Sequence, residues 1–317
     1  MLSFRRVFIF MSLVVLVSFE ALAGPAADAY QFVGFGDTPY GEQGEKDFPK
    51  LIQNINKTDV DFAVHIGDIK NGRSLCTDEH FTKVYNEFET FKTALIYTPG
   101  DNEWTDCHRK SNGSFDPIER LQMLRKIFFK NPTQSLGQKP IALQSQINDK
   151  AHSLYRENAV WESHNMVFVT IHMIGSYNNV DRNPSATQEF LKRNAANIDW
   201  IQNAFALAKK HNAKSVVVFT QANPWMLAST GDYVVVGGFN EFMTEFNKLT
   251  TEFKNPVLFV HGDTHIYRHD KKTVSKDFQA LKNFYRLEVP GDEDTGAVLI
   301  TADFAKTEPF AFKKIAP

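Results

Sequence analysis

The sequence is poor in cysteine, in net charge and in long apolar runs. Only two of its 317 residues are cysteine, which excludes a disulfide-dense scaffold. The 35 basic and 37 acidic residues give a formal charge of −2, so electrostatics provides no reason to expect a nucleic acid or an anionic membrane as partner. The 43% hydrophobic and 23% charged content is typical of a globular protein and excludes wholesale disorder.

The only apolar run that resembles a membrane segment lies at the N-terminus. Arg5 and Arg6 precede the apolar stretch 7–19, and the small residues of Ala21-Leu22-Ala23 follow. This order is typical of a cleavable secretory signal peptide, and an uncleaved anchor is the alternative. We expect residues 1–23 to be a signal peptide and residues 24–317 to form a single domain. The protein is then periplasmic or secreted.

Export bears on the two cysteines, Cys76 and Cys107. In an oxidising compartment two cysteines pair by default, so we expect one disulfide between them, with two free thiols as the alternative. Closing a loop of this size contributes about 3–4 kcal/mol in the chain-entropy model.

Short apolar runs alternate with helical periodicity, which indicates α/β layering. Helical spacing is clearest around Phe48, Phe81 and Ile201. The expected strands are 30–35, 62–66, 94–97, 166–173, 215–219 and 257–261, followed by three more near the C-terminus at 285–289, 297–301 and 309–312.

The dipeptide Gly-Asp occurs six times, and four copies directly follow an expected strand. Their carboxylates are Asp37, Asp68, Asp101 and Asp263; the copies at 231–232 and 291–292 resemble ordinary turns. If the strands are mostly parallel neighbours, the four carboxylates meet at one sheet edge, where ligands bind in open α/β sheets. Unpaired, they repel and some take up protons; a divalent cation resolves that repulsion.

These segments fall in the order of the calcineurin-like metallophosphoesterase motifs, which the chain resembles from residue 31 to about residue 267. The family pattern is an aspartate with a histidine two residues later, Gly-Asp, Gly-Asn-His-Asp/Glu, a lone histidine, and Gly-His-x-His. The resemblance implies an α/β fold in which two mixed β-sheets pack as a sandwich flanked by helices, a four-layer αββα arrangement. It also implies a two-metal site at the strand ends.

The chain departs from this pattern at five positions. Histidines of the family are replaced by Pro39, Asn102, Gln221 and Asp263, and its asparagine ligand is replaced by Asp101. Tyr40, beside Pro39, is a weak candidate for a substitute ligand. The family residues that remain unaltered are Asp37, Asp68, Glu103 and His265.

The replacements exchange nitrogen ligands for oxygen ligands. By resemblance, the ligands are Asp37, Asp68 and His265 for one metal and Asp68, Asp101, Gln221 and Asp263 for the second. The second site is then all oxygen, which favours Mn, Mg, Fe or Ca over Zn. We interpret the pattern as a variant site with two divalent metal ions rather than as a decayed one.

The resemblance also implies the chemistry, in which a bridging hydroxide attacks the phosphorus of a small phosphate ester. Asn102 stands where the family histidine contacts the phosphate; an amide donates a hydrogen bond but delivers no proton near pH 7. Glu103 is expected to orient Asn102. His108 and Arg109 share that loop, and Arg109 either clamps a phosphate or is a plain surface arginine. His65 and His261 are expected to be core histidines.

Three hypotheses for function follow. The first is an exported metal-dependent phosphoesterase that hydrolyses phosphate mono- or diesters. The second is a catalytically impaired protein of the same fold that binds a phosphorylated ligand or a protein partner, and the replaced histidines favour it. The third is an exported structural domain whose Gly-Asp turns bind nothing. The sequence does not indicate the substrate or the oligomeric state.

Overall fold

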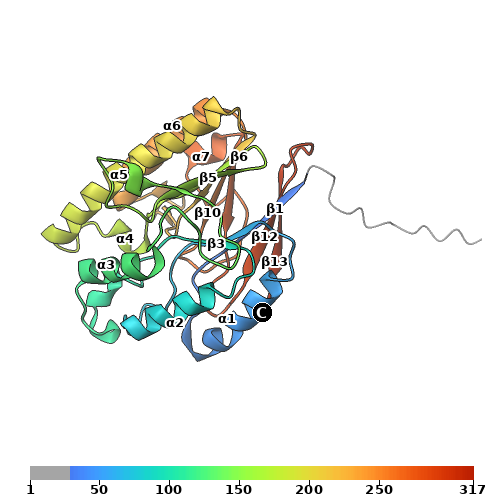
Figure 1. Ribbon diagram of the computed structural model, residues 1–317. Helices are drawn as coiled ribbons and strands as arrows, with labels where there is room; N and C mark the ends of the chain where they lie inside the picture. Colours follow the sequence, from blue (N-terminus) through green and yellow to red (C-terminus); the bar gives the residue numbers. More distant parts are fainter. Residues whose placement is uncertain (1–28) are drawn as a thin grey trace, which may run out of the picture.

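The computed structural model describes residues 29–317, so the expected signal peptide lies outside the described residues. Two large sheets pack face to face (Figure 1). The first has the order β13 (Phe310–Ile315), β12 (Ala297–Ala302), β1 (Tyr30–Phe35), β2 (Phe62–His65) and β3 (Ala94–Tyr97). The second has the order β11 (Phe284–Glu288), β10 (Val257–His261), β7 (Ser215–Phe219), β6 (Met166–Thr170), β5 (Ala159–Ser163) and β4 (Gln144–Ser145). A separate hairpin pairs β8 (Trp225–Leu227) with β9 (Tyr233–Val235).

Helices cover the outer faces of both sheets. They are α1 (Gly41–Ile55), α2 (Asp78–Phe88), α3 (Pro117–Phe128), α5 (Pro184–Lys210), α6 (Asn240–Phe253) and α7 (Lys276–Ala280). The four-residue segment α4 (Gly175–Asn178) is a turn that contains the left-handed residues Ser176 and Tyr177. Short 3₁₀ turns are η1 (Thr105–His108), η2 (Lys110–Asn112), η3 (Gln146–Asn148) and η4 (Gly237–Phe239). Side chains at the N-caps, Thr77 for α2, Asp116 for α3 and Asn183 for α5, accept a backbone N–H and define where those helices begin.

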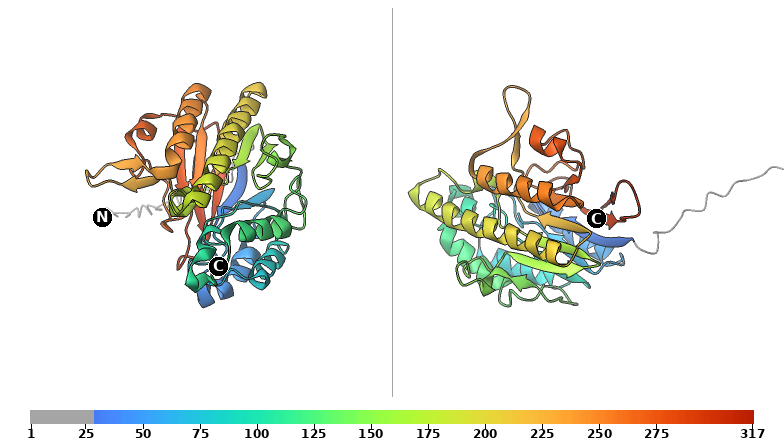
Figure 2. Two further views of the ribbon diagram at one scale, coloured as in Figure 1. Left: turned by 90° about the vertical axis from the view of Figure 1, so that its left-hand side faces the viewer. Right: turned by 90° about the horizontal axis from the view of Figure 1, so that it is seen from above.

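Three apolar clusters separate the layers. Phe48 and Phe88 pack from α1 and α2 onto the outer face of the first sheet, and Ile201 and Phe246 pack from α5 and α6 onto the second. Between the sheets lies a third cluster that includes Phe32, Phe62, Phe168 and Phe219. Figure 2 shows α5 and α6 side by side over the second sheet. The expected four-layer αββα sandwich of two mixed sheets is therefore confirmed.

Strand direction decides where the functional residues gather. In the first sheet β1, β2 and β3 run parallel, with Phe35 opposite His65 and His65 opposite Tyr97. In the second sheet β6, β7, β10 and β11 also run parallel. The carboxyl ends of these strands therefore lie at a common edge in each sheet. The expected strand at 166–173 is shorter, because β6 ends at Thr170.

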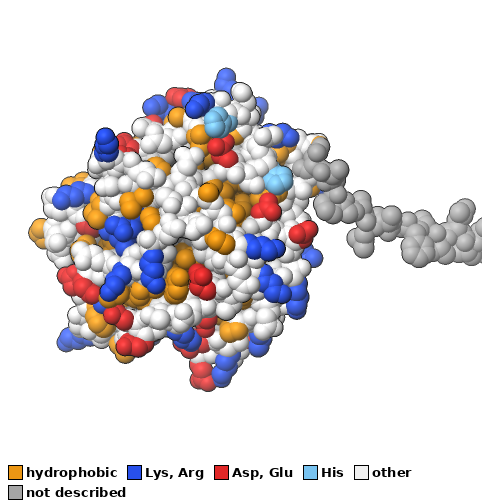
Figure 3. Space-filling view, viewed as in Figure 1, with side chains coloured by type: hydrophobic (Ala, Val, Ile, Leu, Met, Phe, Trp, Pro, Cys, Tyr) orange, Lys and Arg blue, Asp and Glu red, His pale blue; other side chains and the backbone are white. Residues whose placement is uncertain are grey.

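Basic and acidic side chains both occur over the face of the molecule in Figure 3, in keeping with the near-neutral net charge. None of the helices formed by residues 29–317 combines the length and apolar character that a membrane crossing requires.

Candidate active site

Side chains from both sheets meet at the common edge. Asp37, Asp68 and Asp101 follow β1, β2 and β3, whereas Gln221 and Asp263 follow β7 and β10. The Asp263 N–H donates to Asp37 Oδ2 at 3.2 Å, and Gln221 Nε2 donates to Asp68 Oδ2 at 3.3 Å. The expected convergence of the four carboxylates is thus present. Three of them, Asp68, Asp101 and Asp263, line an open pocket of about 650 Å³, whose lining also includes Asn102, Arg109 and His265. Asp37 is fully buried and is not part of that lining.

The backbone at this edge is strained. Asp37, Asp68, Asp263 and His265 have φ values of 50°, 59°, 75° and 59°, in the left-handed region that non-glycine residues rarely adopt. Such strain clusters at functional sites, where the surrounding structure holds it in place. The glycine that precedes an aspartate permits the close approach: a Cβ at Gly262 would lie 2.0 Å from Asp37 Oδ2.

The electrostatics of the site follow from crowding acidic groups away from water. Burial, then the charge of Asp101, raises the pKa of Asp68 well above its usual range. Burial, then the charges of Asp101 and Asp37, raises the pKa of Asp263 to about 8. Burial likewise raises the pKa of Asp37. Without a cation, part of this group takes up protons near neutral pH.

Asp68 is surrounded by hydrogen-bond donors. Its Oδ2 accepts from the Tyr40 hydroxyl at 2.9 Å, from Asn102 Nδ2 at 2.7 Å and from Gln221 Nε2 at 3.3 Å. Burial and the charge of Asp68 raise the pKa of Tyr40 well above its ordinary value. Tyr40 is therefore a neutral phenol that donates to Asp68, which differs from the phenolate ligand considered from the sequence.

Glu103 supports the site in a different way from the one expected. Its Oε1 accepts from the backbone N–H of Gly100 at 2.7 Å and of Asp68 at 3.1 Å, and from the Tyr97 hydroxyl at 2.8 Å. It thus ties together the turns that follow β2 and β3. Asn102, which Glu103 was expected to orient, is held by Asp68 and by the Tyr40 hydroxyl at 2.8 Å.

Of the two loop residues predicted to be catalytic, Arg109 lies at the pocket and His108 does not. Arg109 lines the pocket, 44% of its side chain is exposed, and its Nη1 lies 2.6 Å from Oδ2 of the buried Asp106. The ion pair fixes one edge of the guanidinium, which suits the phosphate clamp. His108 is exposed and donates from Nδ1 to the Thr105 carbonyl at 2.6 Å, outside the residues that line the pocket.

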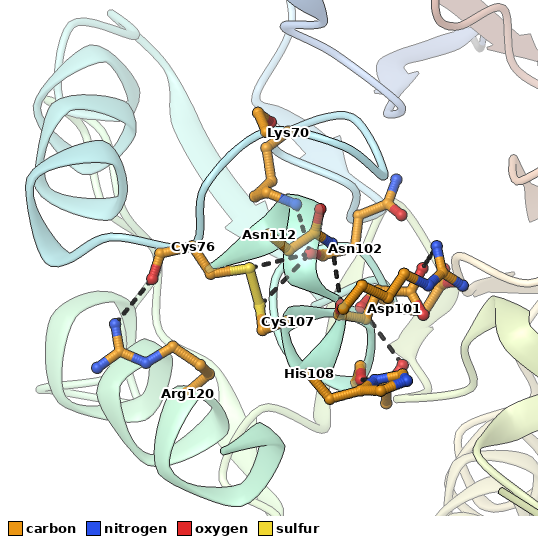
Figure 4. The surroundings of a disulfide bond; sticks show 12 residues. Lys70, Cys76, Asp101, Asn102, Cys107, His108, Asn112 and Arg120 are labelled. Atoms are coloured by element: carbon orange, nitrogen blue, oxygen red, sulfur yellow. Dashed lines mark hydrogen bonds and ion pairs between the residues drawn. A yellow bond between two sulfur atoms is a disulfide. The ribbon is translucent and has the colours of Figure 1, made fainter. Parts of the chain in front are cut away.

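The predicted disulfide between Cys76 and Cys107 is present and anchors this loop. Figure 4 shows the disulfide directly beside the Asn102 carbonyl, with Lys70 approaching the same oxygen. Lys70 Nζ donates to that carbonyl at 2.8 Å and is itself buried. The disulfide and Lys70 therefore hold the backbone that presents Asp101 and Asn102.

Five polar residues that line the pocket were not predicted as site residues: Asn71, Arg73, Asp106, Ser176 and Asp292. The Ser176 hydroxyl donates to Asp101 Oδ2 at 2.7 Å and to Asp106 Oδ1 at 3.1 Å. Asp292 Oδ2 lies 3.8 Å from His265 Nδ1. Asp292 belongs to a Gly-Asp dipeptide that was taken for an ordinary turn, so that motif was the available signal. For Ser176 the signal is the polar loop 175–179, which the sequence leaves open as a cleft lining or a plain turn; in the structure a left-handed φ of 48° brings Ser176 to the pocket.

The two histidines expected in the core are there. His65 is fully buried, accepts the Gly67 N–H on Nδ1 and donates from Nε2 to the Thr38 carbonyl, and burial lowers its pKa to about 4. His261 Nε2 accepts from Arg286 Nε at 2.9 Å, and burial and Arg286 lower its pKa well below the ordinary value. Both histidines are neutral and hydrogen-bonded.

The residues present fit one hard cation better than two. Two observations favour one hard cation: the donors are mostly carboxylate oxygens, and the buried Oδ1 of Asp101 has no hydrogen-bond partner within residues 29–317. A Cβ at Gly175 would fill a cradle 2.5 Å from Asp263 Oδ1 and 2.6 Å from Asp101 Oδ1. A second cation is disfavoured because Asp68 Oδ2 already accepts hydrogen bonds from three donors. Across the described residues, no three His, Cys, Asp or Glu side chains already surround a common metal position.

Gln221 also differs from its expected role as an oxygen ligand. Its Oε1 accepts the Gly175 N–H at 2.5 Å, and its Nε2 faces Asp68 and Asp263 at 3.3 Å each. The amide nitrogen, not the oxygen, is therefore turned toward the carboxylates.

Comparisons with known proteins agree with the fold. A dimetal phosphatase from Danio rerio has a TM-score of 0.56 at 10% identity, covering 90% of this chain and 98% of that chain. GAP50, the anchor in the inner membrane complex of Plasmodium, has a TM-score of 0.53 at 10% identity, with coverages of 91% and 84%. PhoD has a TM-score of 0.52 at 11% identity, with coverages of 86% and 63%.

No curated protein sequence matches the chain. The sequence profile described as calcineurin-like phosphoesterase matches residues 30–267, most of the chain and all of the strand-end motifs. On this match the chain belongs to the calcineurin-like phosphoesterase family.

Proposed function

We propose that this protein is an exported, cation-dependent hydrolase of small phosphate esters. The observation that carries the proposal is the convergence of Asp37, Asp68, Asp101 and Asp263 from two sheets. The last three line one pocket, Asp37 accepts the Asp263 N–H, and Asp101 Oδ1 is buried and unpartnered among the described residues. Three buried carboxylates and the half-buried Asp263 are costly to hold together without a cation, so a structure that retains them favours a bound cation. The signal-peptide pattern and the disulfide support export.

The residues that would hold the cation are Asp37, Asp101, Asp263 and His265. When bound, a divalent cation polarises a phosphoryl oxygen and lowers the pKa of water. Arg109, fixed by Asp106, presents its free N–H groups to the phosphate oxygens. Asn102 and Tyr40 position Asp68.

The site has one consequence for substrate preference. Where the family has a histidine, Asn102 cannot supply a proton to the leaving group. Esters with activated leaving groups, such as nitrophenyl phosphates, are therefore expected to react faster than alkyl phosphates relative to other members of the family.

The test is hydrolysis of nitrophenyl phosphate and of its diester with Mn²⁺, Mg²⁺ or Ca²⁺, comparing wild type with Asp37→Asn. We expect the variant to lose at least about 100-fold in kcat/KM, or roughly 2.7 kcal/mol. The matched control is Asp232→Asn, which alters a Gly-Asp dipeptide that lies outside the pocket and pairs with Lys276. Equal rates for wild type and Asp37→Asn would overturn the proposal.

A second candidate function is binding of a phosphate ester without turnover. The replaced histidines and the three donors on Asp68 favour it. The same assay separates the two: a pure binding protein retains a nitrophenyl phosphate in equilibrium dialysis while its rate equals that of Asp37→Asn. Measuring the mature N-terminus tests export, since cleavage should leave Gly24 first.

A further inference from the structure

The Gln221 side chain occupies a position that its hydrogen bonds define without ambiguity. The backbone N–H of Gly175 can only donate, and it lies 2.5 Å from the Gln221 oxygen. This contact identifies the Oε1 atom, so the other end of the amide must be the NH₂ group. Gly175 is itself confined, because a Cβ there would collide with Asp101 and Asp263. Gln221 is thus locked with its NH₂ group toward the carboxylates.

The NH₂ group of Gln221 lies between two acidic side chains from different strands. Its Nε2 is 3.3 Å from Asp68 Oδ2 and 3.3 Å from Asp263 Oδ1. An amide NH₂ has two hydrogens to donate and offers no lone pair to a metal ion. It can therefore bridge two carboxylates by hydrogen bonds at the place where a cation would otherwise bridge them.

Two further donors complete the same arrangement on Asp68. Asn102 Nδ2 is 2.7 Å from Asp68 Oδ2, and the Tyr40 hydroxyl is 2.9 Å from the same atom. Asn102 Nδ2 also donates to the Tyr40 oxygen at 2.8 Å, so these two side chains support each other. Three donors on one carboxylate oxygen exceed its usual lone-pair capacity and leave Asp68 Oδ2 no room for a metal–oxygen bond.

On Asp101, one carboxylate oxygen has no such donor among the described residues. Asp101 Oδ1 is buried and has no hydrogen-bond partner within residues 29–317, whereas its Oδ2 accepts from Ser176 at 2.7 Å. Asp37 Oδ1 lies 3.5 Å from His265 Nε2, and its only other donor in the described structure is the backbone N–H of Asp263 at 3.3 Å. Ligand capacity therefore remains at Asp37, Asp101 and His265 and is used up at Asp68.

We propose that the fixed donors of Gln221, Asn102 and Tyr40 take the place of a second cation, so that the chain binds one divalent cation instead of a pair. This inference rests on the proposed function, since it concerns the same pocket. The donors neutralise part of the carboxylate charge from within the protein, and the single cation neutralises the remainder. Gln221 and Tyr40 are positioning residues in this arrangement.

Metal stoichiometry tests the inference without any activity measurement. The mature protein is stripped with EDTA, loaded with Mn²⁺, Mg²⁺ or Ca²⁺, freed from unbound ions and analysed by elemental mass spectrometry and titration calorimetry. We expect one ion per chain and a single class of sites. Two ions per chain would overturn the inference and leave the proposed function intact. No bound ion under any of the three loadings would overturn the proposed function itself.

A substitution at Gln221 tests the role of the amide. Gln221→His replaces the NH₂ group by a ring nitrogen with a lone pair, and Gln221→Glu replaces it by an isosteric carboxylate; either is expected to raise the count from one ion to two. The control is Gln144→His on the exposed edge strand β4, which should stay at one. If both Gln221 variants unfold cooperatively like wild type and still bind one ion, the assignment to Gln221 fails.

Discussion

Within the described residues, the acidic groups around Glu157 and at the pocket are both buried but are balanced in different ways. The negative charge of Glu157 is neutralised by a neighbouring side chain of the protein. Arg125 donates from Nε to Glu157 Oε2 at 3.0 Å and from Nη2 to Oε1 at 2.5 Å, and His172 Nδ1 lies 2.8 Å from Oε1. Burial alone raises the pKa of Glu157, but Arg125 and His172 more than offset it, so this pKa lies below its usual range. The cluster is a closed structural unit.

Among residues 29–317, the carboxylates of the pocket cluster, Asp68, Asp101 and Asp263, have no arginine or lysine side chain paired with them in the way that Arg125 is paired with Glu157. They accept hydrogen bonds from neutral donors. Burial and the charges of neighbouring carboxylates raise the pKa values of Asp68 and Asp263. Arg109, which lines the pocket, is paired with Asp106. Similar burial thus leads to opposite pKa shifts, because one cluster contains its own cation and the other does not. An acidic site without an internal cation is one that can accept an external cation.

The largest expected effect comes from breaking the closed cluster. Glu157→Gln leaves the guanidinium of Arg125 buried without its counter-charge, which is expected to lower the free energy of unfolding by about 3–5 kcal/mol. Urea denaturation measures it. Glu162→Gln is the control, because its pair with His211 is exposed and should contribute less than about 1 kcal/mol. A loss below 1 kcal/mol for Glu157→Gln would contradict the comparison.

A disulfide supports the backbone of the pocket cluster, whereas the Glu157 cluster has no disulfide beside it. Replacing both Cys76 and Cys107 by serine opens a loop with a sequence separation of 31, which should lower the free energy of unfolding by about 3–4 kcal/mol. Because the disulfide touches the backbone of Asn102, the variant should also lose cation affinity, as measured by calorimetry. The Glu157 cluster has no such tether, so Glu157→Gln should leave cation affinity nearly unchanged. Equal affinity in the serine variant and wild type would contradict this.

A smaller effect is the pH dependence of the cation-free protein. Folded Asp263, with its pKa raised from 3.8 to about 8, keeps a proton that the unfolded chain releases, so stability is fully present below about pH 4 and falls as the pH rises toward 8. Glu157 acts in the opposite sense: with its lowered pKa, its contribution is present above about pH 4.5 and is lost on acidification.

Thermal unfolding in EDTA from pH 5 to pH 8 measures how steeply the free energy of unfolding falls with pH, which is the slope that the pocket carboxylates cause. Asp263→Asn should flatten it and stabilise the cation-free protein at pH 8 by at least about 1 kcal/mol, the equivalent of one pKa unit. Saturating Ca²⁺ or Mn²⁺ should flatten it in wild type. Asp232→Asn, at an exposed turn, should keep the wild-type slope. A slope unchanged in Asp263→Asn would show that the pocket carboxylates do not titrate as described.

Much of the framework could be predicted from local pattern. The strands before the motif aspartates are apolar, short and bounded by glycine, and β1, β3, β7 and β10 begin and end where the pattern indicates. The hairpin β8–β9, the edge strand β4 and its neighbour β5 were missed. Three of these, β4, β8 and β9, have only two or three residues, too few for a periodic signal.

What the sequence determined by itself is the set of chemical groups: carboxylates directly after short apolar strands, which meet only if those strands run parallel. Only the tertiary structure decided how those groups face each other. The Gln221 amide is turned by Gly175, 46 residues away, and Ser176 and Asp292 reach the pocket from loops with no strand pattern. Hydrogen bonds between segments that lie far apart along the chain depend on packing distances of tenths of an ångström, which local residue patterns do not contain.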